Sequence, residues 1–301
     1  MQECDGVDDL GWLTARFAEN RAQLHAVAYR MLGSATEADD AVQDAWLRAE
    51  QAGAAGIENP AAWLTTIVSR VCLNMLRSRE RRREDPLEAV AATPAAAAED
   101  GGDPEREALL ADSVGLALLV VLDTLAPAER VAFVLHDMFA VPFDEVGPLL
   151  DRSPAAARQL ASRARRRVRG EPAVPGEDLA RQRRVVEAYL AAARQGDFDA
   201  LLTLLDPEVV LRADAAVGPT PAPVSLRGAA TVARGAFASA VRAQSTAAAL
   251  VDGTAGLVMA RDGRAAVVLA FTLDAQGVIT AIDVIAEPAR LRALDLAVLD
   301  A

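Results

Sequence analysis

The stretch FDEVGPLLDRSPAAARQLASRARRRVRG, residues 143–170, predicts a helix, a tight turn and a second helix. Ser153 can cap the second helix, because its hydroxyl can accept a free backbone N–H of the first turn. Pro154 suits the first helical position, where its missing N–H costs nothing. A narrow buried stripe is expected where apolar residues recur four apart, at Leu160, Ala164 and Val168.

The outer face of this second helix has the residue types that read the major groove of DNA. Arginine can bond guanine bidentately, glutamine can bond adenine, and further arginines can hold phosphates. The residues that we expect to read DNA are Ser153, Arg158, Gln159, Ser162, Arg163 and Arg166. The alternative interpretation is a solvated amphipathic helix.

The first helix of the pair contains Gly147 followed by Pro148. A proline inside a helix costs about 3 kcal/mol, because it removes one hydrogen bond and crowds the preceding turn. We therefore expect a kink or a short helix at this point.

Length and charge limit the function classes. The chain has 301 residues, which suggests about two domains. It contains no lysine, and its net charge of −12 excludes a general polyanion binder. Contact with DNA must come from local basic faces, with help from a partner.

Cysteine and histidine are too scarce for most metal or disulfide sites. Cys4 and Cys72 are the only cysteines, and His25 and His136 the only histidines. We expect reduced structural thiols, structural histidines, and no metal or cofactor. The acidic N-terminus is unlike a signal peptide, and the apolar run 114–122 is too short to span a bilayer, so we expect a cytoplasmic protein.

Three amphipathic helices are predicted before residue 84. Ser34 and Glu37 form a capping-box pattern at the start of the second helix, and Asn59 with Pro60 can cap the third. The second helix carries a mostly acidic outer face, made of Asp39, Asp40, Gln43, Asp44 and Arg48. The third carries a polar and basic side made of Arg70, Asn74, Arg77 and Arg81, and Arg79 adds to the basic end of the helix. An unrelated three-helix bundle is the alternative.

The segment FAENRAQLHAVAYRMLGSATEADDAVQDAWLRA, followed by NPAAWLTTIVSRVCLNMLRSRERR, resembles region 2 of an extracytoplasmic-function (ECF) sigma-70 family RNA polymerase sigma factor. The resemblance implies that the acidic helix docks on the β′ clamp helices of core polymerase. It also implies that the loop over 53–59, which follows the acidic helix, and the third helix, with Trp63, open and hold the promoter −10 element. The segment from LDTLAPAERVAF to RRRV resembles region 4, which reads the −35 element and contacts the β flap.

The end of the chain predicts a mixed fold. Helices over 179–194, 198–205 and 229–242 accompany strands over 209–213, 246–251, 255–260, 265–273 and 278–285, and Asp262-Gly263 marks a hairpin turn. This α+β cone resembles the SnoaL-like, NTF2-like superfamily, and the ending resembles the SigJ-type subgroup of sigma factors. In that subgroup the domain regulates the sigma core in cis, so that no separate anti-sigma factor is required. The first linker offers only Asp85-Pro86-Leu87-Glu88 where the subgroup has Trp-Leu-Pro-Glu-Pro.

The expected architecture is multidomain, with two all-α sigma domains and the C-terminal cone. Its parts are region 2 over 8–83, an acidic linker over 84–112, region 4 over 113–170, a second linker over 171–178, and the SnoaL-like domain over 179–301. The function expected is an alternative sigma factor and not an enzyme, with a pocket in the last domain open to a small-molecule ligand.

Two rivals stay open. One is a SnoaL-like enzyme or sensor with a DNA-binding appendage, whose acid–base candidates would be Tyr189, Arg212, Asp214 and Asp283. We expect these four to be structural, since the domain has no histidine to complete an acid–base pair. The other rival is a dimeric helix-turn-helix repressor that binds DNA without polymerase.

Overall fold

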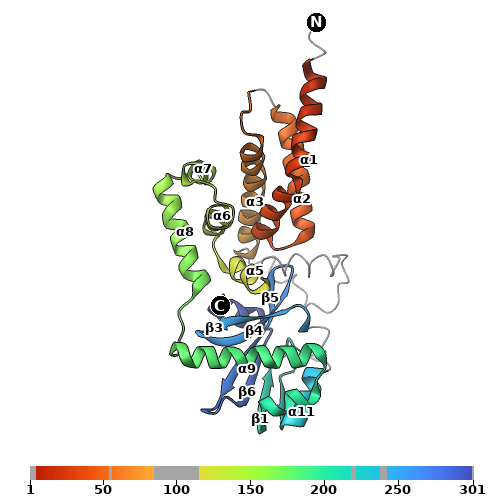
Figure 1. The fold of residues 1–301 in the computed structure, drawn as a ribbon, viewed down its shortest axis with the longest axis vertical. Helices are drawn as coiled ribbons and strands as arrows, with labels where there is room; N and C mark the ends of the chain where they lie inside the picture. The colour runs from red at the N-terminus through yellow and green to blue at the C-terminus, as the bar shows by residue number, and fades with distance from the viewer. Residues whose placement is uncertain (1–4, 54–55, 85–114, 218–221, 238–242, 300–301) are drawn as a thin grey trace. The chain divides into compact units, whose positions relative to one another are not determined.

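The computed structural model describes residues 5–53, 56–84, 115–217, 222–237 and 243–299. The chain divides into two compact units (Figure 1). The helical unit contains Met1–Thr93 and Leu125–Arg165, and the sheet unit contains Pro94–Thr124 and Arg166–Ala301. The chain thus leaves the helical unit, returns to it, and leaves it again. Residues 85–112 of the expected acidic linker, with the Asp85–Glu88 stretch, and Cys4 lie outside the described residues.

Three helices form the first part of the helical unit: α1 (Asp5–Leu32), α2 (Ala35–Ala52) and α3 (Pro60–Glu84). Their shared core contains the fully buried side chains of Leu24, Met31 and Leu64. Local capping sets two of the helix starts. Ser34 Oγ accepts the N–H of Glu37 at 3.4 Å, and Asn59 Oδ1 accepts the N–H of Ala62 at 3.1 Å. The three-helix prediction is confirmed.

The second part of this unit is built from α6 (Pro127–Phe133), a π-helical turn η1 (Val134–Met138), α7 (Phe143–Leu149) and α8 (Pro154–Arg169). Helix α7 has only seven residues and includes Pro148, so the expected short helix is confirmed. Gly147 allows the turn to α8, because a Cβ there would lie 2.9 Å from the main-chain oxygen of Arg152. The helix-turn-helix prediction is confirmed.

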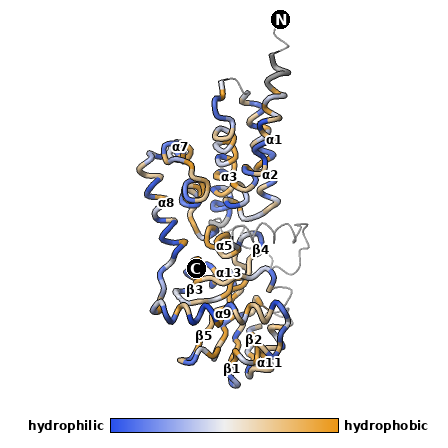
Figure 2. The backbone as a smooth tube through the Cα atoms, in the orientation of Figure 1, coloured by the Kyte–Doolittle hydropathy of each residue, from blue (hydrophilic) through white to orange (hydrophobic). Residues whose placement is uncertain are grey.

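The buried side of α8 differs from the predicted stripe. Ala157, Ala161 and Ala164 are fully buried, whereas Leu160 and Val168 are only partly buried. The prediction favoured the larger apolar residues. The structure instead uses three alanines, which let α8 approach its neighbours closely. The tube of α8 is otherwise mainly hydrophilic (Figure 2).

The sheet unit is organised around one seven-stranded sheet with strand order β2-β1-β6-β5-β4-β3-β7. The strands are β1 (Leu205–Ala213), β2 (Val224–Arg227), β3 (Thr246–Val251), β4 (Thr254–Arg261), β5 (Arg264–Leu273), β6 (Ile279–Ile285) and β7 (Leu296–Ala297). The predicted β3–β6 meander is confirmed, including the turn at Asp262 and Gly263, both of which have positive φ. The parallel pairing of β1 with β6 adds a non-meander connection.

Helices cover both faces of this sheet. One core includes α9 (Gly176–Gln195), α10 (Phe198–Leu204) and α11 (Ala229–Phe237), and there Tyr189 meets Phe271 edge-on at 5.2 Å between ring centroids. The other core includes α5 (Leu116–Thr124), which is apolar over nearly its whole length (Figure 2). A short helix, α13 (Pro288–Ala293), precedes β7. The expected C-terminal α+β architecture is confirmed.

Candidate polymerase and promoter-binding surfaces

The outer face of α2 carries the predicted acidic surface. Asp40 and Gln43 are exposed, and Asp44 pairs with Arg48 through an Nη2–Oδ2 contact of 2.9 Å. Asp39 lies 3.2 Å from Nε2 of His25 on α1, so α1 helps to hold this carboxylate in place. The structure therefore brings all five predicted residues to one side of one helix.

Leu47 belongs to the same face and was missed by the sequence reasoning. It is one of the few large apolar side chains that are exposed, with 48% of its surface accessible. It follows Gln43 by four residues and Asp44 by three, which places it beside them on the helix surface. Its signal in the sequence was an apolar residue out of phase with the buried positions of α2.

The basic side of α3 is largely as predicted. Arg70, Asn74, Arg77 and Arg81 are exposed, and Trp63 is partly buried one turn before Ile67. The exposed residues follow one another at intervals of three or four, so they form a continuous strip along the helix. Such a strip can follow a phosphate backbone, with Trp63 as a stacking surface at one end.

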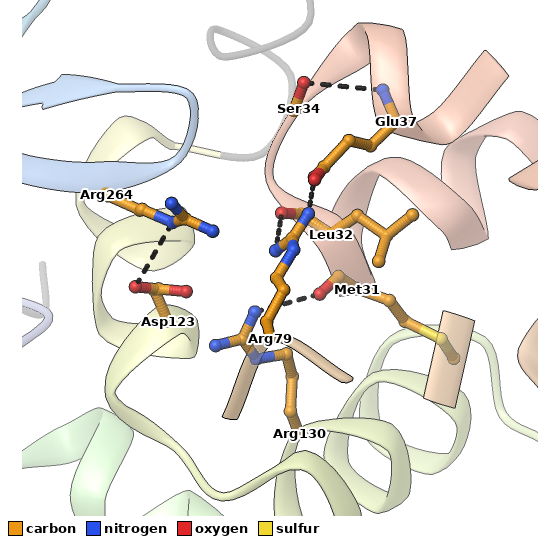
Figure 3. Close-up of polar contacts among 8 residues, drawn as sticks. All are labelled: Met31, Leu32, Ser34, Glu37, Arg79, Asp123, Arg130 and Arg264. Atoms are coloured by element: carbon orange, nitrogen blue, oxygen red, sulfur yellow. Dashed lines mark hydrogen bonds and ion pairs between the residues drawn. The ribbon is translucent and has the colours of Figure 1, made fainter. Parts of the chain in front are cut away.

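Arg79 does not belong to this strip, and its place in the predicted DNA-binding set has to be corrected. Its side chain is buried, where it pairs with Glu37 of α2 and donates from Nη1 to the main-chain oxygen of Leu32 at 3.1 Å (Figure 3). Arg79 lies seven residues after the buried Cys72, hence on the same side of α3. Glu37 therefore turns toward Arg79, so that only the Ser34 half of the expected capping box is confirmed.

A second buried arginine, Arg130 of α6, was not singled out from the sequence. It is 4% exposed and donates from Nη1 to the main-chain oxygen of Met31 at 3.0 Å (Figure 3). The last carbonyls of a helix lack partners within the helix and carry partial negative charge. Two guanidinium groups, from Arg79 and Arg130, thus stabilise the end of α1.

The outward face of α8 presents the predicted DNA-reading residues. Gln159, Ser162 and Arg166 are exposed, and Ser153 Oγ accepts the N–H of Ala156 at 3.2 Å, which confirms the predicted cap. Arg158 lies over the ring of Phe143 at 5.2 Å, and that ring stacks on His136. These contacts tie the start of α8 to the rest of the helix-turn-helix.

Ion pairs hold two further arginines of α8. Nε of Arg163 lies 2.7 Å from Oε1 of Glu129 on α6, and Nε of Arg165 lies 2.7 Å from Oδ1 of Asp137 on η1. Arg163 was predicted to read DNA and Arg165 was not. Both pairs join residues that are far apart in sequence.

Comparison with known proteins matches the two segments of the chain that carry these surfaces. Residues 16–82 match the family model of sigma-70 region 2, and residues 115–168 match that of sigma-70 region 4. The chain is 44% identical over 201 residues to the ECF RNA polymerase sigma factor SigJ of Mycobacterium tuberculosis (strain ATCC 25618 / H37Rv), across 66% of this chain and 64% of SigJ. It is 37% identical over 206 residues to the probable ECF RNA polymerase sigma factor SigI of Mycobacterium tuberculosis (strain CDC 1551 / Oshkosh), across 68% of this chain and 71% of SigI.

The chain belongs to the ECF RNA polymerase sigma factor family. A crystal structure of the Mycobacterium tuberculosis sigma factor SigJ aligns with 92% of this chain and 97% of that one, at 35% identity and a TM-score of 0.46. In this sigma factor, region 2 comprises the three-helix bundle and region 4 includes α5 to α8.

Region 4 of this sigma factor is shared between the two compact units. Helix α5 packs on the sheet through Ala117, Val120 and Val121. At the other end of region 4, the N–H of Val298 donates to the main-chain oxygen of Val168 at 2.8 Å. Asp123 at the end of α5 lies 4.0 Å from Arg264 in the β4–β5 hairpin (Figure 3). No local sequence pattern indicates these contacts, because they join segments more than 100 residues apart.

The segment expected as a second linker also packs on the sheet unit. The N–H of Ala173 donates to the main-chain oxygen of Gly253 at 2.8 Å. A Cβ at Gly253 would lie 2.6 Å from Ala173, so only glycine permits this approach. Residues between α8 and α9 are thereby fixed to the β3–β4 turn.

The four acid–base candidates of the sheet unit have structural surroundings. Asp214 accepts the N–H groups of Ala286 and Glu287 at 2.9 and 2.8 Å, and so closes the loop after β6. Arg212 and Asp283 form an exposed pair on neighbouring strands at 3.7 Å. Burial raises the pKa of Tyr189 from 10 to about 12, so its phenol stays protonated even at moderately alkaline pH.

A cavity of about 210 Å³ lies in the helical unit between α1, α3 and α7. Its polar lining includes Asn59, Thr65, Thr66 and Glu145. Three of these side chains serve the start of α3, since Asn59 caps it and the two threonine hydroxyls donate to carbonyls one turn earlier. Most of the named polar lining is therefore engaged in hydrogen bonds that build the start of α3.

Potential metal ligands are dispersed over the described ranges. There, no group of three or more His, Cys, Asp or Glu side chains is placed to hold a metal ion. Burial raises the pKa of the Cys72 thiol, which disfavours the reactive thiolate. No helix among the described residues is both long enough and apolar enough to cross a bilayer.

Proposed function

We propose that this chain is an alternative sigma factor that directs core RNA polymerase to specific promoters and initiates transcription there. The observation that supports it best is the pairing of two surfaces on one region 2 bundle, an acidic face on α2 and a basic strip on α3. The net charge of −12 makes polymerase an essential partner, because the chain as a whole repels DNA. We place its action in the cytoplasm, where sigma factors meet polymerase.

Each surface has its own role in this proposal. The α2 face, with Asp39, Asp40, Gln43, Asp44 and Arg48, docks on the β′ clamp helices, and region 4 also contacts the β flap. The α3 strip holds the melted −10 element, through Trp63, Arg70, Asn74, Arg77 and Arg81. The α8 face reads the −35 element, through Ser153, Arg158, Gln159, Ser162, Arg163 and Arg166. Arg79 is left out because its guanidinium is committed inside the bundle.

Run-off transcription on genomic DNA tests this proposal. Mycobacterial core polymerase is mixed with the full chain, and the 5′ ends of the transcripts are mapped. We expect discrete start sites that share upstream −10 and −35 elements. The absence of new start sites, together with no binding to core, would overturn the proposal.

The sheet unit is proposed to regulate the sigma factor in cis, without catalysis and without a separate anti-sigma factor. Support comes from its contacts with both ends of region 4, at α5 and at Val168. A small-molecule ligand of this unit would act through the same contacts. Because α5 is buried against the sheet, a ligand that shifts the sheet residues around α5 would change how region 4 binds DNA.

Two variants test the regulation. The first variant ends at Gly170 and lacks the sheet, and the second, Arg264→Ala, lacks only the contact of Arg264 with Asp123. We expect both to change transcript yield from the mapped promoters, while the Arg264→Ala protein keeps its fold. Unchanged yield from both variants would contradict regulation in cis.

A further inference from the structure

The ion pair between Glu129 and Arg163 lies at the edge of the surface that is proposed to read the −35 element. Arg163 is about half exposed, with 49% of its side chain accessible, whereas only 13% of the Glu129 side chain is. Arg163 is four residues after Gln159 and three before Arg166, and both of these are exposed. The guanidinium therefore leaves α8 on its outward face, and a largely buried carboxylate holds it from behind.

The contact uses one particular nitrogen of Arg163. Glu129 accepts from Nε at 2.7 Å, so the other nitrogens remain for other acceptors. A guanidinium recognises guanine through two parallel N–H groups, which bond O6 and N7 in the major groove. With Nε engaged by Glu129, the two terminal Nη groups form the outward edge that can make such a pair.

The carboxylate has two opposite effects on DNA binding. It restricts the rotation of a long side chain before DNA arrives, which lowers the entropy lost when a base is bound. It also cancels positive charge close to the groove, which weakens attraction to phosphates of any sequence. Both effects favour discrimination between base pairs over general affinity.

We propose that Glu129 is a positioning residue that holds Arg163 for bidentate recognition of one G·C base pair in the −35 element. This inference rests on the proposed function, since it requires α8 to read DNA. Arg163 makes the base contact, and Glu129 acts only through it.

The chain supplies a matched control in Asp137 and Arg165. Their Nε–Oδ1 distance is also 2.7 Å, and Arg165 lies on α8 as Arg163 does. Arg165, however, follows the buried Ala164 directly and lies four residues after the buried Ala161, so it leaves α8 on the flank. Neutralising either carboxylate changes the charge by one unit, but only Glu129 supports a residue on the outward face.

The experiment compares base preference with general affinity. Full-length wild-type, Glu129→Gln, Asp137→Asn and Arg163→Ala proteins are each combined with mycobacterial core polymerase. Each position of the mapped −35 element is changed to all four bases, and run-off transcription is measured at two salt concentrations. Arg163→Ala identifies the base pair that depends on Arg163.

For Glu129→Gln we expect the preference at that base pair to fall about tenfold, while transcription from mismatched promoters rises. Asp137→Asn is expected to raise transcription from matched and mismatched promoters by a similar factor, and so to keep every base preference. A Glu129→Gln protein with the wild-type preference profile, or with the profile of Asp137→Asn, would overturn the inference alone. A wild-type protein without any −35 preference would overturn the proposed function as well.

Discussion

Arg130 and Met31 are joined by a buried hydrogen bond across 99 residues of sequence, from Nη1 of the arginine to the main-chain oxygen of the methionine at 3.0 Å. Met31 belongs to region 2, and Arg130 belongs to the helix that opens the return of the chain into the helical unit. The guanidinium is desolvated, and the carbonyls at the end of α1 compensate for part of that cost. A single side chain thus couples the two halves of the helical unit.

Replacement of Arg130 by alanine should destabilise the helical unit. The change leaves the buried oxygen of Met31 without this donor, which typically costs about 1–3 kcal/mol. Urea unfolding followed by tryptophan fluorescence measures this, because Trp12, Trp46 and Trp63 all lie in the helical unit. Arg21→Ala, at an exposed position of α1, is the control and should stay within about 0.5 kcal/mol of wild type. Equal stabilities for the two variants would contradict a structural role for Arg130.

Arg79 and Arg77 should separate folding from promoter binding. Arg79→Ala removes the buried contacts with Glu37 and Leu32 and should lower unfolding free energy by about 1–3 kcal/mol. Arg77→Ala, at an exposed site, should keep stability and reduce transcription from the mapped promoters. Unfolding and run-off assays on both proteins check the pair. If Arg79→Ala were as stable as wild type and lost only transcription, the original assignment of Arg79 to DNA would be restored.

Gly147 should tolerate no larger residue. A Cβ at this position meets main-chain atoms of Arg152, Ser153 and Pro154 at 2.9 to 3.1 Å, and backbone can give way only by distorting the turn. We expect Gly147→Ala to destabilise the helical unit by about 1–3 kcal/mol and to weaken −35 recognition. Gly235→Ala in α11 is the control, since the nearest atom to its Cβ is 3.7 Å away and alanine favours helix. A thermal melt of each protein distinguishes the two cases.

Leu47 should contribute to the affinity for core polymerase. It is exposed among the acidic residues of α2, and burying a leucine at an interface is worth about 1.5–3 kcal/mol. Leu47→Ala should therefore weaken core binding by roughly tenfold in a titration that follows complex formation. Leu10, another exposed leucine, with 43% of its surface accessible, lies on α1 and offers a matched Leu10→Ala control with unchanged affinity. Equal losses for both would place the docking surface elsewhere.

Local chemistry was the predictable part of this fold. The caps at Ser153 and Asn59 and the turn at Asp262–Gly263 depend on neighbours within four residues, so the sequence alone predicts them. Arg79 and Arg130 could not be foreseen in the same way, because their acceptors come from another helix. An arginine in a basic run is predicted to meet solvent, and only tertiary packing shows which one turns inward. The packing of α5 on the sheet is likewise set by segments more than 100 residues later.

Tyr189 should make the sheet unit sensitive to alkaline pH. Burial raises the pKa of its phenol from 10 to about 12, so the folded unit keeps the proton over an interval in which the unfolded chain loses it. The resulting stability is complete below pH 10 and is lost as the pH rises toward 12, at roughly 1.4 kcal/mol per pH unit. The phenylalanine in Tyr189→Phe cannot ionise. Between pH 9 and pH 11.5 the unfolding free energy of this variant should therefore fall by about 2 kcal/mol less than that of wild type. Urea unfolding followed by circular dichroism at both pH values measures this difference. Equal losses of unfolding free energy in the two proteins would show that Tyr189 does not cause the loss of stability at alkaline pH.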